Sequence, residues 1–591
     1  MKTIPIQDLG QGVNKDLLPS ELAPGMLSDV SNFRSRAGFL EKWEGVSTVY
    51  TAGALAYWMQ IMALSTAQRI VVTGGAKFFY YNPATTSSTN ITRYVVEQTV
   101  TTATRIGANT AEFNTGAAHS LTTNDVVTTF GFTEAGYNVT AGVVTVMDTD
   151  TFRLTTTTAI ASNATVMGTY VVTSSSAQTD FTSAEFWTGG VLNGNLVVGN
   201  YTDGLFFWPG SGFLRKFNFK SYKSVATFVF GNYIVQLAPN MDGVLYPNRV
   251  LWSNAAIAGG LPTSFTPAAT NDSRYEDLNG AALLVTGKQF REASYVFSKD
   301  GCYVMRYVGG ALVHTLDRID DYGCIGRWAV ANTPVGQVFV TPALDIRVHN
   351  GGASRSIAEG VIRTLLPSTA DLTSLSERMR LVVNQRKNEL WVILRSPSSS
   401  FNDRILVGSW PTADGEPWRW SVFNIPGGDY ITTAAEGIYP GYGSNNNEQN
   451  YVLTMNASSV VGAAGGLTQG TGVGQWYGNN LTGTAERTGL HFGDYDTHKT
   501  LDGVLPNVDA TAAATATWYT GSSKTADGTV TWTSGATHTV GTTKYVDQRA
   551  TAGPFVGWKV STTAYPYLIR SMNLRFAGGA PSRSSFGGGS R

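Results

Sequence analysis

Two stretches, VFSKDGCYVMRYVGG (Val296–Gly310) and VFVTPALDIRVHNGG (Val338–Gly352), decide the fold that this sequence predicts. They align without a gap, match at the opening Val-Phe and the closing Gly-Gly, and are offset by 42 residues. Each predicts a hairpin. In the first, β-favouring residues stand on both sides of Lys299-Asp300-Gly301, where glycine supplies the positive φ of a tight turn. In the second, the chain turns at Pro342 to Asp345.

The offset indicates a repeating unit. Four-stranded units that recur at about 40–45 residues are typical of β-propeller blades, which bury their apolar faces only by stacking around an axis. Further hairpin patterns raise the number of groups to about six to eight, enough to close a propeller. Two hairpins of a large sandwich that align by chance remain the alternative.

The composition favours the same fold class. The chain has 591 residues, 65 of them glycine, and only 14% are charged. A high glycine content and a low charged fraction are typical of a chain with short strands and many turns. The best helical pattern, near Leu372 to Val383, predicts one short helix at most. We therefore expect an all-β protein: a β-propeller-like core with an inserted small β-module and a C-terminal β region.

The domain boundaries follow changes in sequence texture. From about Thr99 to Ser176 the chain becomes rich in Thr and Ala and nearly free of Lys, which indicates a module inserted into a surface loop. The predicted divisions are an irregular N-terminal platform segment (1–50), first propeller strands (51–98), the inserted β-domain (99–176), the propeller (177–460), and a C-terminal β region with a Gly/Ser tail (461–591).

Charge and cysteine content exclude several classes. Lys plus Arg and Asp plus Glu both number 42, so no net field would attract nucleic acid or an acidic membrane. Two cysteines, Cys302 and Cys324, are too few for a disulfide scaffold, and we expect buried free thiols. The first residues lack the apolar core of a signal peptide, and the apolar run Ala54 to Leu64 is shorter than the roughly 20 residues of a membrane helix. We expect synthesis as a soluble protein in a cytoplasm, without a membrane span.

Catalytic motifs are scarce. The sequence has neither a G-x-S-x-G elbow nor a phosphate-binding P-loop, since the Gly470 to Gly474 stretch lacks the lysine. One polar cluster, His491, Asp494, Asp496 and His498, would place three alternating side chains on one face of a strand and could bind a cation. A solvent-facing polar strand is the favoured interpretation. Carboxylate pairs for glycoside cleavage can be drawn from Asp317, Asp320, Asp321 or Glu359, but chains of this size contain many such pairs. We expect no enzyme, cofactor or resident metal.

The N-terminal run NFRSRAGFLEKWEGV, from Asn32 to Val46, has charged residues beside Phe39, Leu40 and Trp43. An entry strand with its charges on the solvent face is the simplest interpretation. The candidate residues for an interface with another subunit or an adaptor protein are Arg34, Arg36, Lys42 and Trp43.

This run resembles the opening of the tail nozzle proteins of short-tailed bacteriophages, also called tail tubular protein B. Gly38, Leu40, Lys42 and Gly45 stand at matching positions. The stretch Val250–Pro267, the two opening hairpins and Lys499–Val508 are similar to the same proteins, so the resemblance covers most of the chain outside the insert.

The insert is itself similar to a small β-module that recurs in phage tail and surface proteins. The pattern that carries this likeness is formed by Ala118, His119, Leu121, Asp125, Val126, Tyr137 and Asn138.

The resemblance implies a structural virion protein: a tail nozzle subunit that forms a ring, expected to be a homohexamer, below the head-to-tail adaptor ring. The ring would form the distal DNA channel of the short tail, hold genomic DNA without sequence-specific contacts, and gate genome ejection. Tail fibre or spike proteins are further implied partners, and assembly would occur in the host bacterial cytoplasm. A host-surface glycan-binding tail adhesin is the alternative, and a propeller hydrolase is a third hypothesis.

Overall fold

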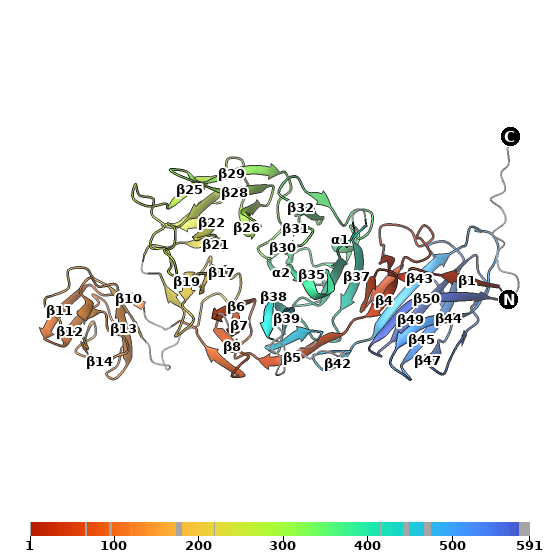
Figure 1. Cartoon of the computed structure of the whole chain (residues 1–591), viewed down its shortest axis with the longest axis horizontal. Helices are drawn as coiled ribbons and strands as arrows, with labels where there is room; N and C mark the ends of the chain where they lie inside the picture. Colours follow the sequence, from red (N-terminus) through yellow and green to blue (C-terminus); the bar gives the residue numbers. More distant parts are fainter. Residues whose placement is uncertain are drawn as a thin grey trace.

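The computed structural model describes residues 2–65, 68–93, 97–119, 121–172, 180–217, 219–413, 416–440, 448–465 and 474–577. Its strands form three bodies in a row: a small module, a propeller and a β-sandwich (Figure 1). The chain is an all-β protein, as the sequence predicts. The turn expected at Asp414-Gly415, most of the loop from Gly466 to Gly478 and the Gly/Ser tail lie outside the described residues.

Within the described residues, the propeller consists of seven sheets, here called blades 1 to 7, whose strand pairs are antiparallel except for β41 (Gln475–Trp476) and β5 (Gly45–Thr51) in blade 7. Blade 1 contains β6 (Trp58–Ser65), β7 (Gln68–Gly74), β8 (Phe78–Asn82) and β9 (Ser87–Asn90). Blade 2 contains β17 (Thr188–Leu192), β18 (Asn195–Asn200), β19 (Gly204–Trp208) and β20 (Arg215–Lys216). Blade 3 contains β21 (Lys223–Phe230), β22 (Tyr233–Met241), β24 (Arg249–Trp252) and β25 (Arg274–Asp277), with β23 (Val244–Leu245) beside β22. Blade 4 contains β26 (Leu284–Phe290), β27 (Ala293–Ser298), β28 (Cys302–Gly309) and β29 (Val313–Asp320). Blade 5 contains β30 (Val330–Thr333), β31 (Gly336–Val340), β32 (Ile346–His349) and β33 (Arg355–Ser356). Blade 6 contains β34 (Arg380–Asn384), β35 (Glu389–Leu394), β36 (Arg404–Ser409) and β37 (Arg419–Asn424). Blade 7 is β38 (Ile431–Pro440), β39 (Glu448–Asn456), β40 (Val460–Ala464) and β5 (Gly45–Thr51), extended by β41 (Gln475–Trp476) and β42 (Asn479–Asn480).

The first strand of each blade lies innermost, and successive innermost strands contact one another around the ring, from β6 to β38 and back to β6. Blade 7 joins both ends of the propeller sequence, because β5 precedes blade 1 in the chain but pairs antiparallel with β40. Tyr50 of β5 stacks on Tyr81 of blade 1, with ring centroids 3.9 Å apart. The N-terminal strand therefore closes the circle.

The repeated hairpins occupy equivalent places in neighbouring blades. The stretch that begins at Val296 forms β27 and β28 of blade 4, and the stretch that begins at Val338 forms β31 and β32 of blade 5. Both turns fall where the sequence predicts them. Their offset is thus the length of one blade, and the prediction of a propeller is confirmed.

The inserted module lies between blades 1 and 2 at one end of the molecule (Figure 1). Its seven strands are β10 (Glu97–Thr99), β11 (Thr102–Gly107), β12 (Thr110–Asn114), β13 (Val126–Phe130), β14 (Gly142–Val146), β15 (Thr151–Thr155) and β16 (Thr169–Val172). They enclose a separate apolar core that includes Phe113, Tyr137 and Phe152. Because blades 1 and 2 contribute little to this core, the module can be inserted without disturbing the propeller.

The pattern residues of the module are structural. His119 is buried and its Nδ1 accepts a hydrogen bond from the Leu121 amide at 2.9 Å. The Asp125 carboxylate accepts one from the Thr122 amide at 2.8 Å. Tyr137 is fully buried and its hydroxyl donates to the Ser162 carbonyl at 3.1 Å. These residues fix turns and core packing, which explains their spacing.

The sandwich contains strands from both ends of the chain. The first sheet contains β3 (Phe33–Arg36), β4 (Phe39–Lys42), β50 (Tyr567–Phe576), β44 (Leu501–Ala510) and β48 (Val546–Asp547), with β1 (Lys2–Ile6) beside β50. The second sheet contains β2 (Asp29–Ser31), β43 (Gly483–Leu490), β49 (Phe555–Thr562), β45 (Thr515–Ser523), β46 (Thr531–Trp532) and β47 (Ala536–Thr539). The prediction of an irregular segment at 1–50 is wrong. Its strands are short and interrupted by prolines, and their pairing partners lie more than 400 residues away.

The remaining elements are short. The described helices are α1 (Leu365–Thr369), α2 (Leu375–Arg378) and the 3-10 turns η1 (Leu9–Gln11), η2 (Ala135–Tyr137) and η4 (Gln385–Lys387). Cys302 and Cys324 are buried free thiols, as expected, and burial raises the pKa of both. Among the helices of the described ranges, none has the length and apolar character needed to cross a membrane.

We predict that the Tyr50–Tyr81 contact contributes strongly to propeller closure. Tyr50→Ala should lower the free energy of unfolding by about 3 kcal/mol, because it leaves a cavity between blades 7 and 1. The Tyr50 hydroxyl is buried without a hydrogen-bond partner, so Tyr50→Phe should change stability by less than about 1 kcal/mol. Urea unfolding measures both, with the exposed Thr51→Ala as control; equal effects of the Ala and Phe variants would contradict the prediction.

We predict a loss of stability in mild acid from two propeller histidines. Burial lowers the pKa of His314, which packs against Tyr233 and Trp252, to about 4, and it lowers the pKa of His349 to about 4 as well. The unfolded chain takes up these protons near pH 6.5 and the folded chain does not, so stability should fall as the pH drops from about 6.5 to 4. Each histidine should contribute about 1–3 kcal/mol.

Thermal unfolding measured across this pH range tests the effect. His314→Phe should flatten the dependence, whereas the exposed His498→Gln should leave it unchanged. An unaltered pH profile in His314→Phe would contradict the assignment.

Candidate functional site

The four residues predicted to form an interface lie inside the chain. Arg34 is 1% exposed, Lys42 0% and Trp43 2%, and the Arg36 side chain is 17% exposed. Buried side chains cannot contact another subunit, so the interface prediction is wrong for Arg34, Lys42 and Trp43. The same holds for the interpretation that these charges lie on a solvent face.

Arg34 instead occupies the centre of an ion cluster between the sandwich and blade 6. Its Nε lies 2.8 Å from Glu389 Oε1 of β35, its Nη1 lies 3.7 Å from Glu41 Oε2, and it also pairs with Glu44. Arg36 Nε lies 3.2 Å from Glu41 Oε2 and Arg36 Nη2 lies 3.2 Å from Glu389 Oε1. Through these charge-assisted contacts, the cluster connects β3 and β35, which are about 350 residues apart in sequence.

The cluster shifts the titration of its members. Burial disfavours the Glu41 carboxylate, but Arg34 and the neighbouring cations more than compensate and lower the pKa of Glu41 to about 2. The pKa of Glu44 is lowered in the same way, and that of Arg34 is raised despite its burial. Arg34, Glu41 and Glu44 therefore stay charged near neutral pH, which keeps the connection between the two bodies in place.

Trp43 and Lys42 complete this junction. The Trp43 ring meets Trp391 of blade 6 edge to face at 5.0 Å between centroids, and it also contacts Phe423. The Lys42 ammonium is buried without a hydrogen-bond partner, and burial lowers its pKa to about 8. These contacts describe an internal joint of one chain.

The predicted cation cluster is not assembled. His491 to His498 form the loop between β43 and β44 and not a strand, so their side chains do not alternate on one face. His491 Nε2 contacts the Ser20 carbonyl at 3.2 Å, while Asp494 accepts hydrogen bonds from the Asp496 and Thr497 amides. Within the described ranges, no group of three His, Cys, Asp or Glu side chains is arranged to hold a metal ion.

The candidate catalytic carboxylates are engaged in local contacts. Asp317 lies 3.5 Å from Arg306, Asp321 lies 3.1 Å from Arg318, and Glu359 lies 3.5 Å from Arg363. Asp320 accepts a hydrogen bond from the Ser354 amide at 2.7 Å. Each carboxylate is thus held by a surface arginine or by a backbone amide.

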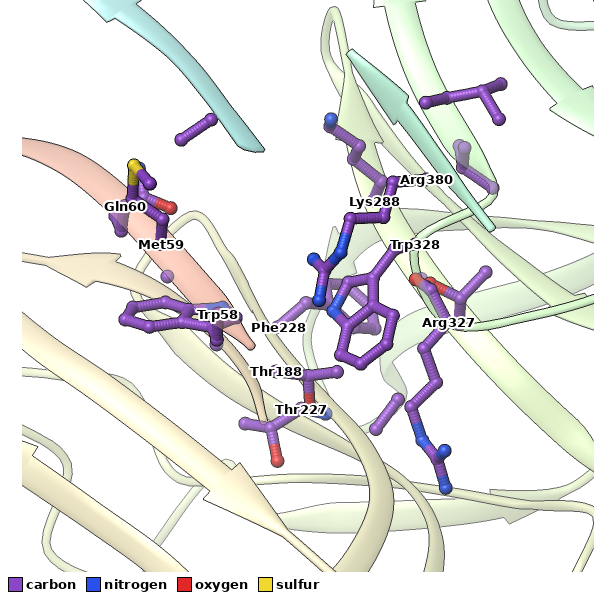
Figure 2. A pocket seen from close by; sticks show the side chains of 18 of the residues that line it. Trp58, Met59, Gln60, Thr188, Thr227, Phe228, Lys288, Arg327, Trp328 and Arg380 are labelled. Atoms are coloured by element: carbon purple, nitrogen blue, oxygen red, sulfur yellow. Dashed lines mark hydrogen bonds between the residues drawn. The ribbon is translucent and has the colours of Figure 1, made fainter. Parts of the chain in front are cut away.

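A cavity of about 480 Å³ lies on the propeller axis. The innermost strands of all seven blades line it, and Figure 2 shows Trp58 and Met59 on one wall and Trp328 and Arg380 on the opposite wall. Lys288 and Glu436 also line it. Cationic, hydrogen-bonding and aromatic side chains from several blades therefore converge in this cavity.

Three of the lining residues, Arg327, Trp328 and Arg380, are together called the floor of the cavity. Trp328 Nε1 donates to the Trp187 carbonyl at 3.1 Å, and Arg327 Nε donates to the Val225 carbonyl at 2.6 Å. Arg380 Nη2 donates to the Tyr57 carbonyl. The floor thus links blades 5 and 6 to the strands of blades 1, 2 and 3.

Sequence analysis did not identify the cavity residues. Arg380, Lys288 and Trp328 stand in separate blades, and no motif connects them. The recognisable signal is the blade repeat itself, which predicts that early residues of each innermost strand converge on the axis. The blade repeat therefore predicts which strand positions face the axis. It does not predict the residue types there, because the side chains at these positions differ between blades.

Comparisons with known proteins give a fold-level likeness only. No family model matches the chain, and no curated protein matches it. Similar solved structures include BamB from Moraxella catarrhalis (10% identity, 74% of this chain and 91% of that chain, TM-score 0.30). Two further examples are the computationally designed Ika8 protein (11% identity, 71% of this chain and 98% of that chain, TM-score 0.29) and BBS1N in complex with ARL6DN (11%, 73% and 100%, TM-score 0.32). Because these TM-scores are low, the propeller assignment rests on the strand pairing of this chain.

We predict that the ion cluster is required for stability. Arg34→Met should lower the free energy of unfolding by about 3–5 kcal/mol, because it leaves the buried Glu44 carboxylate without its cation and leaves Glu389 with Arg36 alone. Chemical denaturation measures the loss. The matched control is Arg306→Met, whose exposed pair with Asp317 should contribute less than about 1 kcal/mol. Similar losses in the two variants would contradict a special role for the cluster.

Proposed function

We propose that this chain is a structural subunit of a bacteriophage short tail, the tail nozzle, in which copies form a ring around the distal DNA channel. In this proposal the ring is a homohexamer, attaches to the head-to-tail adaptor, carries or contacts tail fibre or spike proteins, and gates genome ejection. The proposal starts from the resemblance at Gly38, Leu40, Lys42 and Gly45 and over the propeller hairpins.

The observation that carries it is the way in which both ends of the chain are fixed. Strands β1 to β4 pair with or lie beside C-terminal strands in the sandwich, and β5 closes the propeller. The sandwich then packs on β37 and is joined to blade 6 by the Arg34 cluster. A subunit that surrounds pressurised DNA needs such a rigid connection between its bodies, since a flexible joint would let the ring open.

The charge balance supports the same role. A conduit that passes DNA should avoid strong phosphate contacts, because each contact would add to the affinity and slow the transit. The chain has equal numbers of basic and acidic residues. Many of its arginines are also neutralised by carboxylates within the chain, including Arg34, Arg249 and Arg347.

The alternative of a glycan-binding adhesin receives less support. Aromatic platforms for sugars need exposed faces, and tryptophan is the side chain best suited to this. All 14 tryptophans lie in the described part of the chain; twelve are buried, and Trp328 and Trp532 are half-buried. Trp328 faces the axial cavity and not an open surface.

The mass of the assembly tests the proposal. The purified chain, alone and mixed with the adaptor ring of a short-tailed phage, is examined by native mass spectrometry and by negative-stain class averages. We expect a closed ring with a central hole, with six copies of the 63.3 kDa chain. The chain without adaptor is the control for self-assembly. A monomer under every condition would contradict the proposal, and a ring of another order would contradict only the hexamer.

A further inference from the structure

The axial cavity has the size and lining of a ligand site. Its volume of about 480 Å³ lies within the range of about 300–1,000 Å³ that is typical for small-molecule pockets. Three cationic side chains and one carboxyl line it, together with Trp58, Phe228 and Trp328. Structural support of the propeller alone would be served by apolar side chains, so the charged groups require an explanation.

Arg380 is the most deeply buried of the three cations, and its hydrogen bonding is incomplete. Its side chain is buried, with 4% exposure, and its guanidinium lies 3.8 Å from the Trp328 ring centroid. One hydrogen bond goes to the Tyr57 carbonyl, while Nε has no hydrogen-bond partner. Within the described ranges, no carboxylate lies within ion-pair distance of it. Burial, followed by the nearby Arg378, lowers the pKa of Arg380 to about 9.

Two other buried arginines show what the protein normally provides. Arg34, equally buried, has three glutamates around it. Arg487, also 1% exposed, lacks a glutamate but donates to three backbone carbonyls, those of Pro19, Leu22 and Thr488. Arg380 has a single carbonyl and an aromatic face. Glu185, which pairs with Arg378, offsets only part of the cost of burying Arg380. Arg380 is therefore a buried cation without a carboxylate at ion-pair distance in the described chain.

Lys288 adds a second available cation on the same wall. It is half-buried, and the described chain offers it no hydrogen bond and no carboxylate within ion-pair distance. Glu436 is close enough to act on it electrostatically, but the Glu436 carboxyl accepts a hydrogen bond from the Val383 amide, and burial raises its pKa. Glu436 thus compensates Lys288 weakly.

Arg327, the third cation, is already engaged. Its Nε donates to the Val225 carbonyl, its guanidinium lies 4.8 Å from the Phe186 ring centroid, and Figure 2 shows it directed away from Arg380. The charge available to a ligand therefore comes from Arg380 and Lys288. Opposite them, Trp58 presents an apolar wall with few polar atoms.

We propose that the axial cavity of the propeller binds a small organic anion, whose carboxylate or phosphate group contacts Arg380 and Lys288 and whose apolar part lies between Trp58 and Trp328. Arginine and lysine are the side chains that recognise both groups. The volume accommodates a ligand larger than a bare inorganic ion. The ligand would also connect blades 1, 4, 5 and 6 across the axis and so stabilise the closed ring of blades.

Isothermal titration calorimetry at constant ionic strength tests this proposal on the full chain. The probes are citrate, glycerol 3-phosphate and, as the neutral comparison, glycerol. We expect one citrate or glycerol 3-phosphate per chain with a Kd below about 1 mM and no glycerol binding. Citrate binding without glycerol 3-phosphate binding would identify a carboxylate ligand, and the converse a phosphate ligand. Absence of binding for both anions, or equal binding of glycerol, would overturn the proposal.

Two variants locate the site. Lys288→Met should weaken anion binding about tenfold, since it removes a cation that has no structural partner and therefore leaves the fold intact. The matched control Lys223→Met changes an exposed lysine outside the cavity and should bind like the unmodified chain. Arg380→Met should abolish binding, with circular dichroism as the check on folding. Unchanged affinity in Lys288→Met would place any binding elsewhere and overturn the proposal. This outcome is independent of ring assembly, which is measured separately by mass.

Discussion

Closure of the propeller is the constraint on which the rest of the structure depends. Seven blades form a stable ring only when the last blade is tied to the first, and here the N-terminal strand β5 makes that tie by pairing with β40. Once β5 is fixed there, the residues before it must leave the propeller beside blade 6 and blade 7. They do so as β2 to β4, which find partners among the C-terminal strands. The sandwich is thus a consequence of how the circle is closed.

Buried charge serves different purposes in the two halves of the chain. At the joint between the sandwich and blade 6, Arg34 is surrounded by three glutamates of the same chain, which compensate its charge. On the propeller axis, Arg380 is buried to a similar degree but incompletely compensated. A buried ionic group without its partner is costly to maintain, and Arg380, unlike the other buried cations, lines a cavity large enough for a ligand. The first arrangement holds bodies together, and the second leaves room for another molecule.

The three bodies have separable roles in the proposed tail subunit. The sandwich shares one apolar core with blades 4, 5 and 6, and these parts form a rigid block. The module has its own core and lies at the far end of the molecule, attached through a loop between two blades (Figure 1). It can therefore vary in position or sequence without affecting closure. Such an arrangement suits a ring that has a constant wall and a peripheral attachment.

The sequence by itself determined the local structure. The paired hairpins at Val296 and Val338 encode the blade length, because strand periodicity and turn residues act over a few positions. The change of texture near Thr99 marks the module, and the sparse cysteines indicate buried thiols. Only the tertiary structure decided where the charges lie. Arg34 and Lys42 have the local pattern of surface residues, but Glu389 and the C-terminal strands that cover them are more than 300 residues away. Arg380, Lys288 and Trp58 meet on the axis for the same reason: burial and electrostatic partners depend on long-range contacts, which no local pattern in one sequence specifies.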